Sequence, residues 1–363
     1  MRALCIGLVG PGLIGKALVL QLDQQAAYLA TQMGLRVALV AVANSRRQLL
    51  APAGAPLQGA QDWQERLQAA GDPVSLPALA SHVAAQRGPG GVGVIVDCTA
   101  SDEVPDHYAA WLRAGLHVVT PNKKWGAGPL PRHAAALAAA REGRARLLAE
   151  ASVGAGLPVL GPLRDLVETG DAVTRIEGIL SGTLSYIFNT WAPGQAFSSV
   201  VGAAKELGYT EPDPREDLSG MDVARKVVIL ARGCGLKTEL SDLKVESLVP
   251  APLREGSAED FMRRLPEFDA EMGARAEAAA AGGGVLRYVG AVDAAAGTAS
   301  VTLQTFPAAH PFAQLRGSDN VVSFATRRYA ATPLIVRGPG AGAEVTAAGV
   351  FGDVLCIARG AAE

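Results

Sequence analysis

The 363-residue sequence predicts an α/β protein built from two domains, and three observations support that fold class. First, the chain is longer than a typical single domain, and its hydrophobic content of 49% is enough to build two cores. Second, apolar runs alternate with helical patterns through the N-terminal third, which is typical of a parallel sheet covered by helices on both faces. Third, a glycine-rich loop directly follows the first apolar run.

Four apolar runs in the N-terminal third have the length and composition of buried strands. They are residues 3–8, 37–43, 92–98 and 117–120. Helical spacing begins at Gly15 and recurs over residues 104–114. The first two runs are separated by about thirty residues, the usual size of a strand–helix–strand unit. Residues 46–90 are less regular, and we expect only helices there.

The first glycine loop, GLVGPGLIG, places Gly10, Gly12 and Gly15 in a G-x-G-x-x-G pattern between a strand and a helix. In this pattern the first glycine permits a tight turn, the second lets the backbone approach a pyrophosphate, and the third lets the helix pack against the strand. The free N–H groups at the helix N-terminus bind phosphate. We therefore predict a Rossmann-type dinucleotide-binding domain; the alternative is a plain turn.

The end of the second run favours NADP as the dinucleotide, although NAD stays possible. An acidic residue here usually binds the NAD ribose. The stretch VALVAVANSRRQLL has no acid, and instead offers Asn44, Arg46 and Arg47. Paired arginines can neutralise a 2′-phosphate. The alternative is that the two arginines begin a solvated helix.

The pattern changes near Glu150, where EASVGAGLPVLGPL has the glycine and proline content of a domain junction. We expect a first domain over residues 1–150, completed by residues 334–363, and a second domain over residues 151–333. In the second half, residues 257–281 are predicted as helix and residues 285–292, 299–305 and 334–336 as strands. The glycine loop GPGAGAEVTAAGVFGDVLCIA leads into a last helix.

Two loops are candidates for ligand contacts. VVTPNKKWG places Lys123 at the carboxyl end of a strand, where dinucleotide domains face their ligand. Lys123 could transfer a proton or bind a carboxylate, but a lysine pair is more often solvated. The carbonyls of ASVGAGLP, next to Glu150, suit a hard monovalent or divalent cation. A structural hinge explains the same residues equally well.

The stretch ELGYTEPDPREDLSGMDVARKVVIL combines an acidic, proline-stiffened loop with an apolar helix. Asp222 and Lys226 are four residues apart, so they share one helix face. A surface ion pair is the ordinary explanation. However, the neighbouring residues are mostly apolar, so we expect Lys226 to be buried, and a buried lysine beside an acid is a candidate proton donor. The carboxylates from Glu211 to Asp217 suit a substrate ammonium group.

The stretch IEGILSGTLSYIFN predicts a strand that leads into a Gly-Thr helix start. Its N–H groups and the Thr183 hydroxyl could bind a substrate carboxylate or carbonyl, although a simple N-cap is the alternative. Together, a dinucleotide site, an ammonium-binding acidic cluster and two lysines suit hydride transfer on a small amino-acid alcohol or aldehyde.

The chain also resembles the homoserine dehydrogenases over nearly its whole length. The matching stretches are GLVGPGLIG, VANSRRQLL, VDCTAS, VVTPNKK, EASVGAGLPV, GILSGTLSYIFN, GYTEPDPREDLSGMDVARKVVILAR and GPGAGAEVTAAGVFGDVL. The resemblance implies interconversion of L-homoserine and L-aspartate 4-semialdehyde in threonine, methionine and isoleucine biosynthesis. It also implies an α+β second domain with a mixed sheet, in which residues 285–330 form a homodimer.

The resemblance assigns roles residue by residue. Lys226 resembles the family's acid/base lysine and Lys123 its second lysine, while Asp222 would orient the substrate hydroxyl and Lys226. The substrate set is Glu211, Asp217, Gly182, Thr183 and Tyr209. The cofactor set adds Leu13, Ile14, Thr99 and Gly342 to Gly10, Gly12, Gly15, Asn44, Arg46, Arg47 and Lys123. A monovalent cation, sodium, would be bound by Glu150, Val153, Ala155 and Leu157.

VANSRRQLL and TPNKK resemble the kinase-fused and fungal branches of the family more than the branch with a C-terminal regulatory ACT domain. Because the chain ends at Glu363, we expect no threonine feedback through such a domain.

Charge and cysteine content exclude other classes. The net charge is −2 and no basic run is present, so no nucleic-acid partner is expected. No apolar segment suits a membrane span or a signal peptide, and the four scattered cysteines fit a reducing, cytoplasmic compartment. One alternative is a dehydrogenase with Cys98 or Cys234 as a thioester-forming nucleophile. Another is a non-catalytic NADP-sensing regulator, which would not need Lys226.

Overall fold

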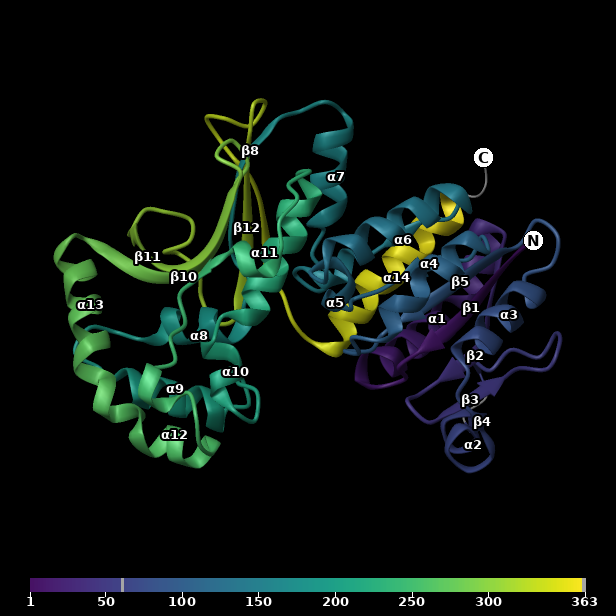
Figure 1. Ribbon diagram of the computed structural model, residues 1–363, viewed down its shortest axis with the longest axis horizontal. Coiled ribbons are helices and arrows are strands. Elements are labelled where there is room, and N and C mark those ends of the chain that lie inside the picture. Colours follow the sequence, from purple (N-terminus) through teal and green to yellow (C-terminus); the bar gives the residue numbers. More distant parts are fainter. Residues whose placement is uncertain (60–61, 361–363) are drawn as a thin grey trace. The chain divides into compact units, whose positions relative to one another are not determined.

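The computed structural model describes residues 1–59 and 62–360, and the chain divides into two compact units (Figure 1). The first unit contains Met1–Gly156 together with the C-terminal segment that begins at Ala341. The second unit is Leu157–Gly340. Among the described residues, no helix is both long enough and apolar enough to cross a bilayer.

The first unit is built on a seven-stranded sheet with the order β4-β3-β2-β1-β5-β6-β7. Its strands are β1 (Arg2–Val9), β2 (Leu35–Ala43), β3 (Arg47–Leu50), β4 (Asp72–Pro73), β5 (Val92–Asp97), β6 (His117–Val119) and β7 (Leu147–Leu148). The strands from β2 through β1, β5 and β6 to β7 are parallel. The carboxyl ends of β1, β2, β5 and β6 therefore lie at one edge of the sheet, where dinucleotides bind in this architecture.

Helices connect the parallel strands of this sheet and cover it. They are α1 (Leu13–Met33), α2 (Trp63–Ala70), α3 (Leu76–Gln86), α4 (Tyr108–Arg113), α5 (Lys123–Gly126), α6 (Leu130–Glu142) and α14 (Ala343–Gly360), with 3-10 turns η1 (Val104–His107) and η2 (Glu150–Ser152). The last helix, α14, packs beside α1, and α4 packs beside α6 (Figure 1). The C-terminal segment thus completes the first unit's core, to which Val350, Val354 and Ile357 contribute fully buried side chains.

One prediction for this unit was wrong. Residues 46–90 were expected to contain only helices, but β3 and β4 form an antiparallel extension at the edge of the sheet. The cause is the turn at Asn44, whose Oδ1 accepts hydrogen bonds from the backbone N–H groups of Arg46 and Arg47, both at 2.8 Å. This Asx-type turn reverses the chain directly into β3, so the arginines do not begin a helix.

The second unit has a mixed six-stranded sheet with the order β13-β12-β8-β10-β11-β9. Its strands are β8 (Val173–Ile179), β9 (Lys244–Val245), β10 (Gly284–Asp293), β11 (Thr298–Pro307), β12 (Asp319–Thr326) and β13 (Leu334–Pro339). All neighbouring pairs are antiparallel except β11 and β9. Because β13 pairs with β12, its residues belong to this unit, whereas the sequence placed residues 334–340 with the first domain.

The helices of the second unit include three that pack on strand β10, namely α8, α11 and α13. The helices are α7 (Leu160–Glu168), α8 (Gly182–Thr190), α9 (Phe197–Glu206), α10 (Pro214–Leu218), α11 (Met221–Gly233), α12 (Ala258–Arg264) and α13 (Asp269–Ala281), with 3-10 turns η3 (Leu240–Asp242), η4 (Ala251–Leu253) and η5 (Leu265–Phe268). The acidic stretch before α11 was expected to be a loop, but Pro214 begins the short helix α10, capped by Asp213. Proline favours the first helical turn because that turn needs no N–H donor there.

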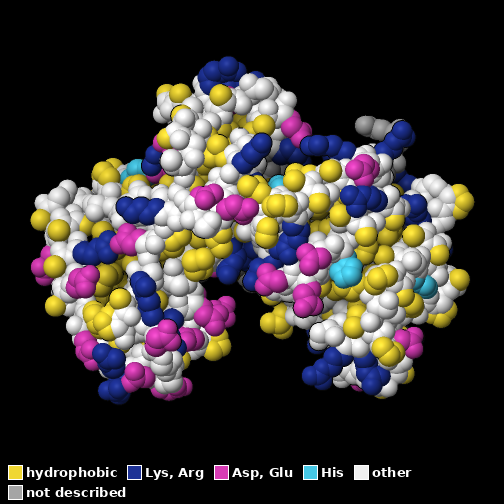
Figure 2. All heavy atoms as spheres, in the orientation of Figure 1, with side chains coloured by type: hydrophobic (Ala, Val, Ile, Leu, Met, Phe, Trp, Pro, Cys, Tyr) yellow, Lys and Arg dark blue, Asp and Glu magenta, His cyan; other side chains and the backbone are white. Residues whose placement is uncertain are grey.

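The face of the molecule shown in Figure 2 carries basic and acidic side chains close to one another. This mixed distribution agrees with the small net charge of −2.

Candidate active site

The glycine turn after β1 needs glycine at two of its three motif positions. Gly10 has φ +86°, and a Cβ there would lie 2.7 Å from Thr99 Cγ2. A Cβ on Gly15 would lie 2.6 Å from the Gly10 carbonyl oxygen. Gly12, the N-cap of α1, differs because no described heavy atom lies within 4 Å of its Cβ position. The turn therefore brings α1 close to β1 and leaves open space beside its N-terminus, as pyrophosphate binding requires.

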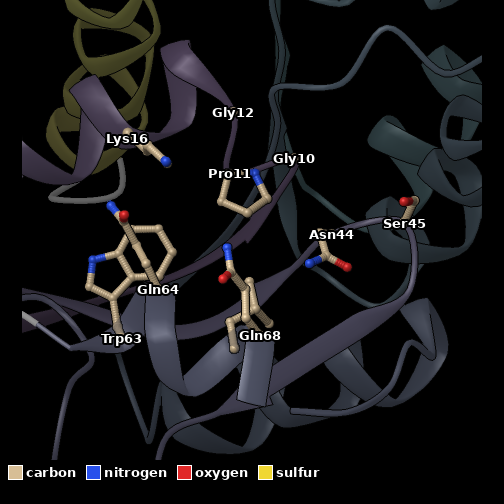
Figure 3. Close-up of a pocket in the computed structure, with 10 residues that line it drawn as sticks. Gly10, Pro11, Gly12, Lys16, Asn44, Ser45, Trp63, Gln64 and Gln68 are labelled. Atoms are coloured by element: carbon tan, nitrogen blue, oxygen red, sulfur yellow. The ribbon is translucent and has the colours of Figure 1, made fainter. Parts of the chain in front are cut away.

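A cavity of about 300 Å³ lies beside this turn in the first unit (Figure 3). Its lining residues come from the glycine turn, the end of β2 and helix α2: Gly10, Pro11, Gly12, Lys16, Asn44, Ser45, Trp63, Gln64, Leu67 and Gln68. Figure 3 shows the Lys16 amine and the Asn44, Gln64 and Gln68 amides around the space. Among these residues, Lys16 carries the only formal charge and none is acidic, so the cavity favours an anionic group.

The predicted cofactor residues at the end of β2 differ in position. Asn44 lines the cavity, and because its Oδ1 is used by the turn, its Nδ2 donor remains available. Arg47 Nη1 donates to the carbonyl oxygen of Gly71 at 2.9 Å, and Arg46 is exposed. Neither arginine is among the lining residues. Lys16, which the sequence analysis missed, has the position that a phosphate-binding cation would need.

A buried hydrogen-bond network joins the ends of β5 and β6. Asp97, the last residue of β5, is 0% exposed. Its Oδ1 accepts from the Thr99 N–H at 2.8 Å, and its Oδ2 accepts from Tyr108 Oη at 2.5 Å and from Asn122 Nδ2 at 3.1 Å. Burial raises the pKa of Asp97 and also that of Tyr108. This network was not predicted from the sequence, although Asp97 two residues before Thr99 is a recognisable Asx-turn pattern.

Lys123 is the first residue of α5 and is half-buried. Asn122 is the N-cap of this helix, and its Oδ1 accepts from the Lys124 N–H at 3.0 Å. Lys124 forms an ion pair with Asp102 at 2.9 Å. The backbone at Lys123 is therefore held by a capped helix.

In the second unit, Lys226 lies on α11 and is 8% exposed, as its apolar neighbours predicted. Its Nζ donates to the Leu180 carbonyl oxygen at 2.7 Å and pairs with Asp222 Oδ2 at 2.8 Å. The Asp222 side chain is 45% exposed, so this ion pair reaches from the core to the surface. Because Leu180 follows β8 directly, the amine is held at the junction between β8 and α8.

Several predicted substrate residues meet at the same junction. Thr183 Oγ1 lies 2.6 Å from the Tyr209 carbonyl oxygen and 2.8 Å from Asp217 Oδ1. Asp217 Oδ2 accepts from the Glu211 N–H at 2.9 Å. Burial raises the pKa of Asp217, and the nearby charge of Asp222 raises it further. The structure thus places Thr183, Tyr209, Glu211 and Asp217 together, close to the acid that pairs with Lys226.

Gly182, the remaining residue of the predicted substrate set, begins α8. Its N-cap, Ser181, accepts a hydrogen bond from the Leu184 N–H, so the cap interaction that the sequence offered as an alternative is present. The Tyr209 side chain stacks on Tyr186 with ring centroids 4.4 Å apart. The Tyr209 ring is therefore ordered although the residue is 42% exposed.

Both units match models of one protein family. Residues 10–150 match the model for the homoserine dehydrogenase NAD binding domain, and residues 158–355 match the homoserine dehydrogenase model. A homoserine dehydrogenase of Emericella nidulans is 45% identical over 97% of this chain and 97% of its own length. The chain belongs to the homoserine dehydrogenase family.

Other relatives of this homoserine dehydrogenase family member have different lengths. A chloroplastic bifunctional aspartokinase/homoserine dehydrogenase of Zea mays is 50% identical over 97% of the chain. The chain spans only 38% of that relative's length. Among solved structures, a Candida auris protein of unknown function superposes with a TM-score of 0.90 at 40% identity and covers 99% of both chains. These matches agree with the resemblance to the fused and fungal branches.

The remaining cofactor residues expected in a homoserine dehydrogenase all lie in the first unit. Leu13 is 81% exposed at the start of α1, while Ile14 and Thr99 are half-buried beside the glycine turn. Gly342 has φ +113° and directly precedes α14. The family model and the open glycine turn identify this unit as a nicotinamide dinucleotide-binding domain.

The segment that the family resemblance predicts to bind a cation has an unusual backbone. Gly154 and Ala155 have consecutive positive φ values of 80° and 56°. The Glu150 N–H donates to Asp353 Oδ2 at 2.8 Å, which fixes the start of the segment on α14. Glu150, Val153 and Ala155 belong to the first unit, and Leu157 begins the second.

The cysteine-nucleophile alternative is not supported by the surroundings of the two thiols. Burial raises the pKa of Cys98 far above its usual value and that of Cys234 to about 12. A thiol must lose its proton to attack a carbonyl, so both residues are better explained as small core side chains.

Proposed function

We propose that the chain catalyses the NADP-dependent interconversion of L-homoserine and L-aspartate 4-semialdehyde. The observation that carries this proposal is Lys226, a buried lysine whose amine is fixed by one carbonyl and one carboxylate beside a cluster of further acids. A structural ion pair on a helix surface needs neither the burial nor the second acceptor. The non-catalytic regulator considered above has no use for this arrangement.

The amine of Lys226 is arranged to transfer one proton. An ammonium group has three N–H donors, and Leu180 O and Asp222 accept two of them. The third is left for a substrate oxygen. In the reducing direction Lys226 gives its proton to the oxygen of the aldehyde as the carbon receives hydride; in the oxidising direction the neutral amine takes the hydroxyl proton. The nicotinamide supplies or accepts the hydride.

The acids beside Lys226 would bind the amino-acid part of the substrate. Glu211 is exposed and its carboxylate suits the substrate ammonium group. The Asp217 carboxyl orients the Glu211 backbone and the Thr183 hydroxyl. Asp222 would orient the substrate hydroxyl together with Lys226. The N–H groups at the start of α8, at Gly182, are available for a carboxylate or carbonyl.

We propose NADP rather than NAD as the main dinucleotide, with Lys16 as a phosphate ligand in addition to Arg46. Lys16 and Asn44 are donors that line a cavity without an acid, and a 2′-phosphate has the complementary charge. Arg46 is exposed and able to reach a bound phosphate, whereas Arg47 is engaged with Gly71. Lys123 would lie near both cofactor and substrate.

Three further features are proposed on the family resemblance. Sodium would be held by the carboxylate or carbonyls of Glu150, Val153, Ala155 and Leu157. The donor set of oxygens suits a hard cation, and the positive φ values of Gly154 and Ala155 turn successive carbonyls in different directions. A homodimer through the sheet of the second unit is supported by Ile335, which is 41% exposed on the edge strand β13. The reaction would serve threonine, methionine and isoleucine biosynthesis.

The experiment that tests this function is NADPH oxidation, followed by absorbance, after addition of L-aspartate 4-semialdehyde to the purified chain. The expected result is consumption of NADPH that depends on the aldehyde, with slower consumption of NADH at equal concentration. Absence of turnover with both nucleotides would refute the proposal. Equal rates with NADH and NADPH would refute only the cofactor preference.

A further inference from the structure

Asp97 is a buried carboxylate for which the mechanism above has no role. It lies at the carboxyl end of β5, is fully buried, and has no lysine or arginine partner among the residues that the structure describes. Taking an acid out of water without a cation is costly unless hydrogen bonds compensate for the loss of hydration. A residue retained at that cost needs a structural or functional reason.

Two of the partners of Asp97 come from separate segments of the first unit, the loop after β5 and the cap of α5. The Thr99 N–H donates to Asp97 Oδ1, and the Thr99 N and Cγ2 atoms lie 2.9 and 2.7 Å from the position that a Cβ on Gly10 would take. Asn122 donates to Oδ2 and also caps α5, which begins at Lys123. The Asp97 carboxylate therefore holds both the loop beside the glycine turn and the N-cap of α5.

A second connection strengthens this link. The Thr120 hydroxyl donates to the Asp97 carbonyl oxygen at 2.8 Å and accepts from the Asn122 N–H at 2.9 Å. Asn122 Nδ2 also donates to the Ser101 carbonyl oxygen at 2.9 Å. The cap residue is thus held through its backbone and its side chain, and both connections lead back to the end of β5.

We propose that Asp97 is a positioning residue, which sets Lys123 and the glycine turn at a fixed separation for the dinucleotide. It acts through Asn122 and Thr99 and touches neither substrate nor cofactor. The inference rests on the proposed function, because it gives Lys123 a place beside the cofactor.

The chemistry of Asp97→Asn makes this testable. The new amide oxygen keeps the place of Oδ1, which accepts from the Thr99 N–H. The amide N–H₂ group takes the place of Oδ2 and faces its two partners, Tyr108 and Asn122. Tyr108 can adapt, because its hydroxyl can accept from the new amide and donate to Thr120 Oγ1, 3.1 Å away. Asn122 cannot adapt, since its Nδ2 is only a donor. The substitution therefore disturbs the cap of α5 selectively.

The experiment compares kcat, the KM for NADPH and the melting temperature of four variants. Asp97→Asn is expected to lower kcat by about tenfold or more, since small misplacements of catalytic groups have effects of that size. Asn122→Ser keeps an N-cap but loses the bond to Asp97, so it should lower kcat similarly. Tyr108→Phe removes a bond to Asp97 without touching the cap, so its kcat should stay within about threefold of wild type.

Asp171→Asn is the matched control. Asp171 is also buried and accepts from Thr326 Oγ1, the Arg328 N–H and the Ala172 N–H, but it belongs to the second unit, whereas Asp97 and its partners belong to the first. The Asp171→Asn substitution should lower the melting temperature and leave kcat unchanged. The proposal would be overturned if Asp97→Asn kept kcat within about threefold, or if Tyr108→Phe lost as much activity as Asp97→Asn.

Failure of the proposed enzymatic function can be distinguished from failure of the inference about Asp97. If the wild-type chain turned over no substrate, NADPH binding followed by fluorescence would still test the positioning of Lys123 through the cap of α5. Asp97→Asn should then weaken binding while Tyr108→Phe does not, and equal affinity of the two variants would overturn the inference. If Asp97→Asn failed to fold, the pair Asn122→Ser and Tyr108→Phe would decide the same question.

Discussion

Lys226 is the residue on which the proposed chemistry depends. Lys226→Ala should lower turnover by about 10²–10⁴-fold, the usual contribution of a general acid or base. NADPH binding should persist, because the glycine turn and its cavity belong to the first unit. The measurements are kcat for homoserine oxidation and the dissociation constant of NADPH.

The control for this prediction is Lys237→Ala, which removes an exposed lysine from the same unit. It should leave both quantities unchanged. Unaltered turnover in Lys226→Ala would show that the amine has no role in proton transfer.

The contribution of individual basic side chains to the preference for NADPH over NADH can be measured. Lys16→Ala and Arg46→Ala should each raise the KM for NADPH more than that for NADH, because only NADPH carries the additional phosphate. For Lys16→Ala we expect the KM for NADPH to rise about tenfold, equivalent to about 1.4 kcal/mol of binding free energy. Parallel increases for both nucleotides would remove the phosphate-binding role of the residue concerned. Arg36→Ala, an exposed arginine on β2, serves as the control.

At the residue scale, the sequence predicted some of the site and missed the rest for physical reasons. The burial of Lys226 follows from helical periodicity, which is local information. The network around Asp97 joins positions up to 25 residues apart, which periodicity does not reveal. Lys16 sits one residue after a recognised motif, but only the position of α2 makes it part of a cavity.

At the scale of elements, the start of α11 depends on Gly220. This residue has φ +74°, and a Cβ there would lie 2.0 Å from the Tyr288 hydroxyl oxygen. Tyr288 is 2% exposed and donates to the Glu246 carbonyl oxygen at 2.6 Å, so it has little freedom to move. Gly220→Ala should lower the unfolding free energy by about 1–3 kcal/mol through overpacking, with further loss from the left-handed backbone.

The measurement for Gly220→Ala is equilibrium urea unfolding, with Gly202→Ala as its control. Gly202 lies within α9, and no described atom lies within 4 Å of its Cβ position. Alanine there should be neutral or should stabilise by about 0.5–1 kcal/mol. Equal stability changes for the two substitutions would contradict the account of Gly220.

Strand β6 of the first unit's sheet contains a histidine whose protonation opposes folding. His117 on β6 has a pKa lowered to about 4, first by burial and then by the charges of Arg146 and Arg87. Its Nδ1 accepts from the Arg146 N–H at 2.9 Å. In the unfolded chain a histidine has a pKa of about 6.5 and binds a proton more readily. The stabilisation from neutral His117 is therefore complete above about pH 6.5 and is lost as the pH falls toward 4.

His117→Asn tests this account, because an asparagine oxygen can still accept from the Arg146 N–H without gaining charge in acid. Between pH 7 and pH 5 the melting temperature of the variant should fall less than that of the wild-type chain. An identical fall in both proteins would show that His117 does not contribute to the acid sensitivity.

The predicted elements were correct where the hydrophobic pattern was long and regular. Strands β1, β2, β5, β10 and β11 and helices α1, α11 and α14 all lie where the sequence placed them. Strands β3 and β4 were missed because RQLL is short and partly polar, and the Asn44 turn that creates β3 is formed by side-chain hydrogen bonds. Strand β12 was not identified individually, since its pairing with β8 joins residues far apart in the chain.

At the scale of the whole molecule, one chain supplies two units with different tasks. The first unit has an open glycine turn and an acid-free cavity, which are features of nucleotide binding. The second holds a buried amine beside carboxyl groups, which suits an amino-acid alcohol. The chain begins the second unit at Leu157 and returns to the first at Ala341, so the first unit combines two segments distant in sequence.

The central claim is that Lys226 transfers the proton of the substrate hydroxyl. The most direct measurement is the distance from Lys226 Nζ to that oxygen in a crystal structure with homoserine and NADP bound. The account predicts a hydrogen bond of about 2.6–3.2 Å, with Leu180 O and Asp222 as the other two acceptors of the amine. An amine directed into solvent, with the substrate hydroxyl bound by other groups, would contradict it.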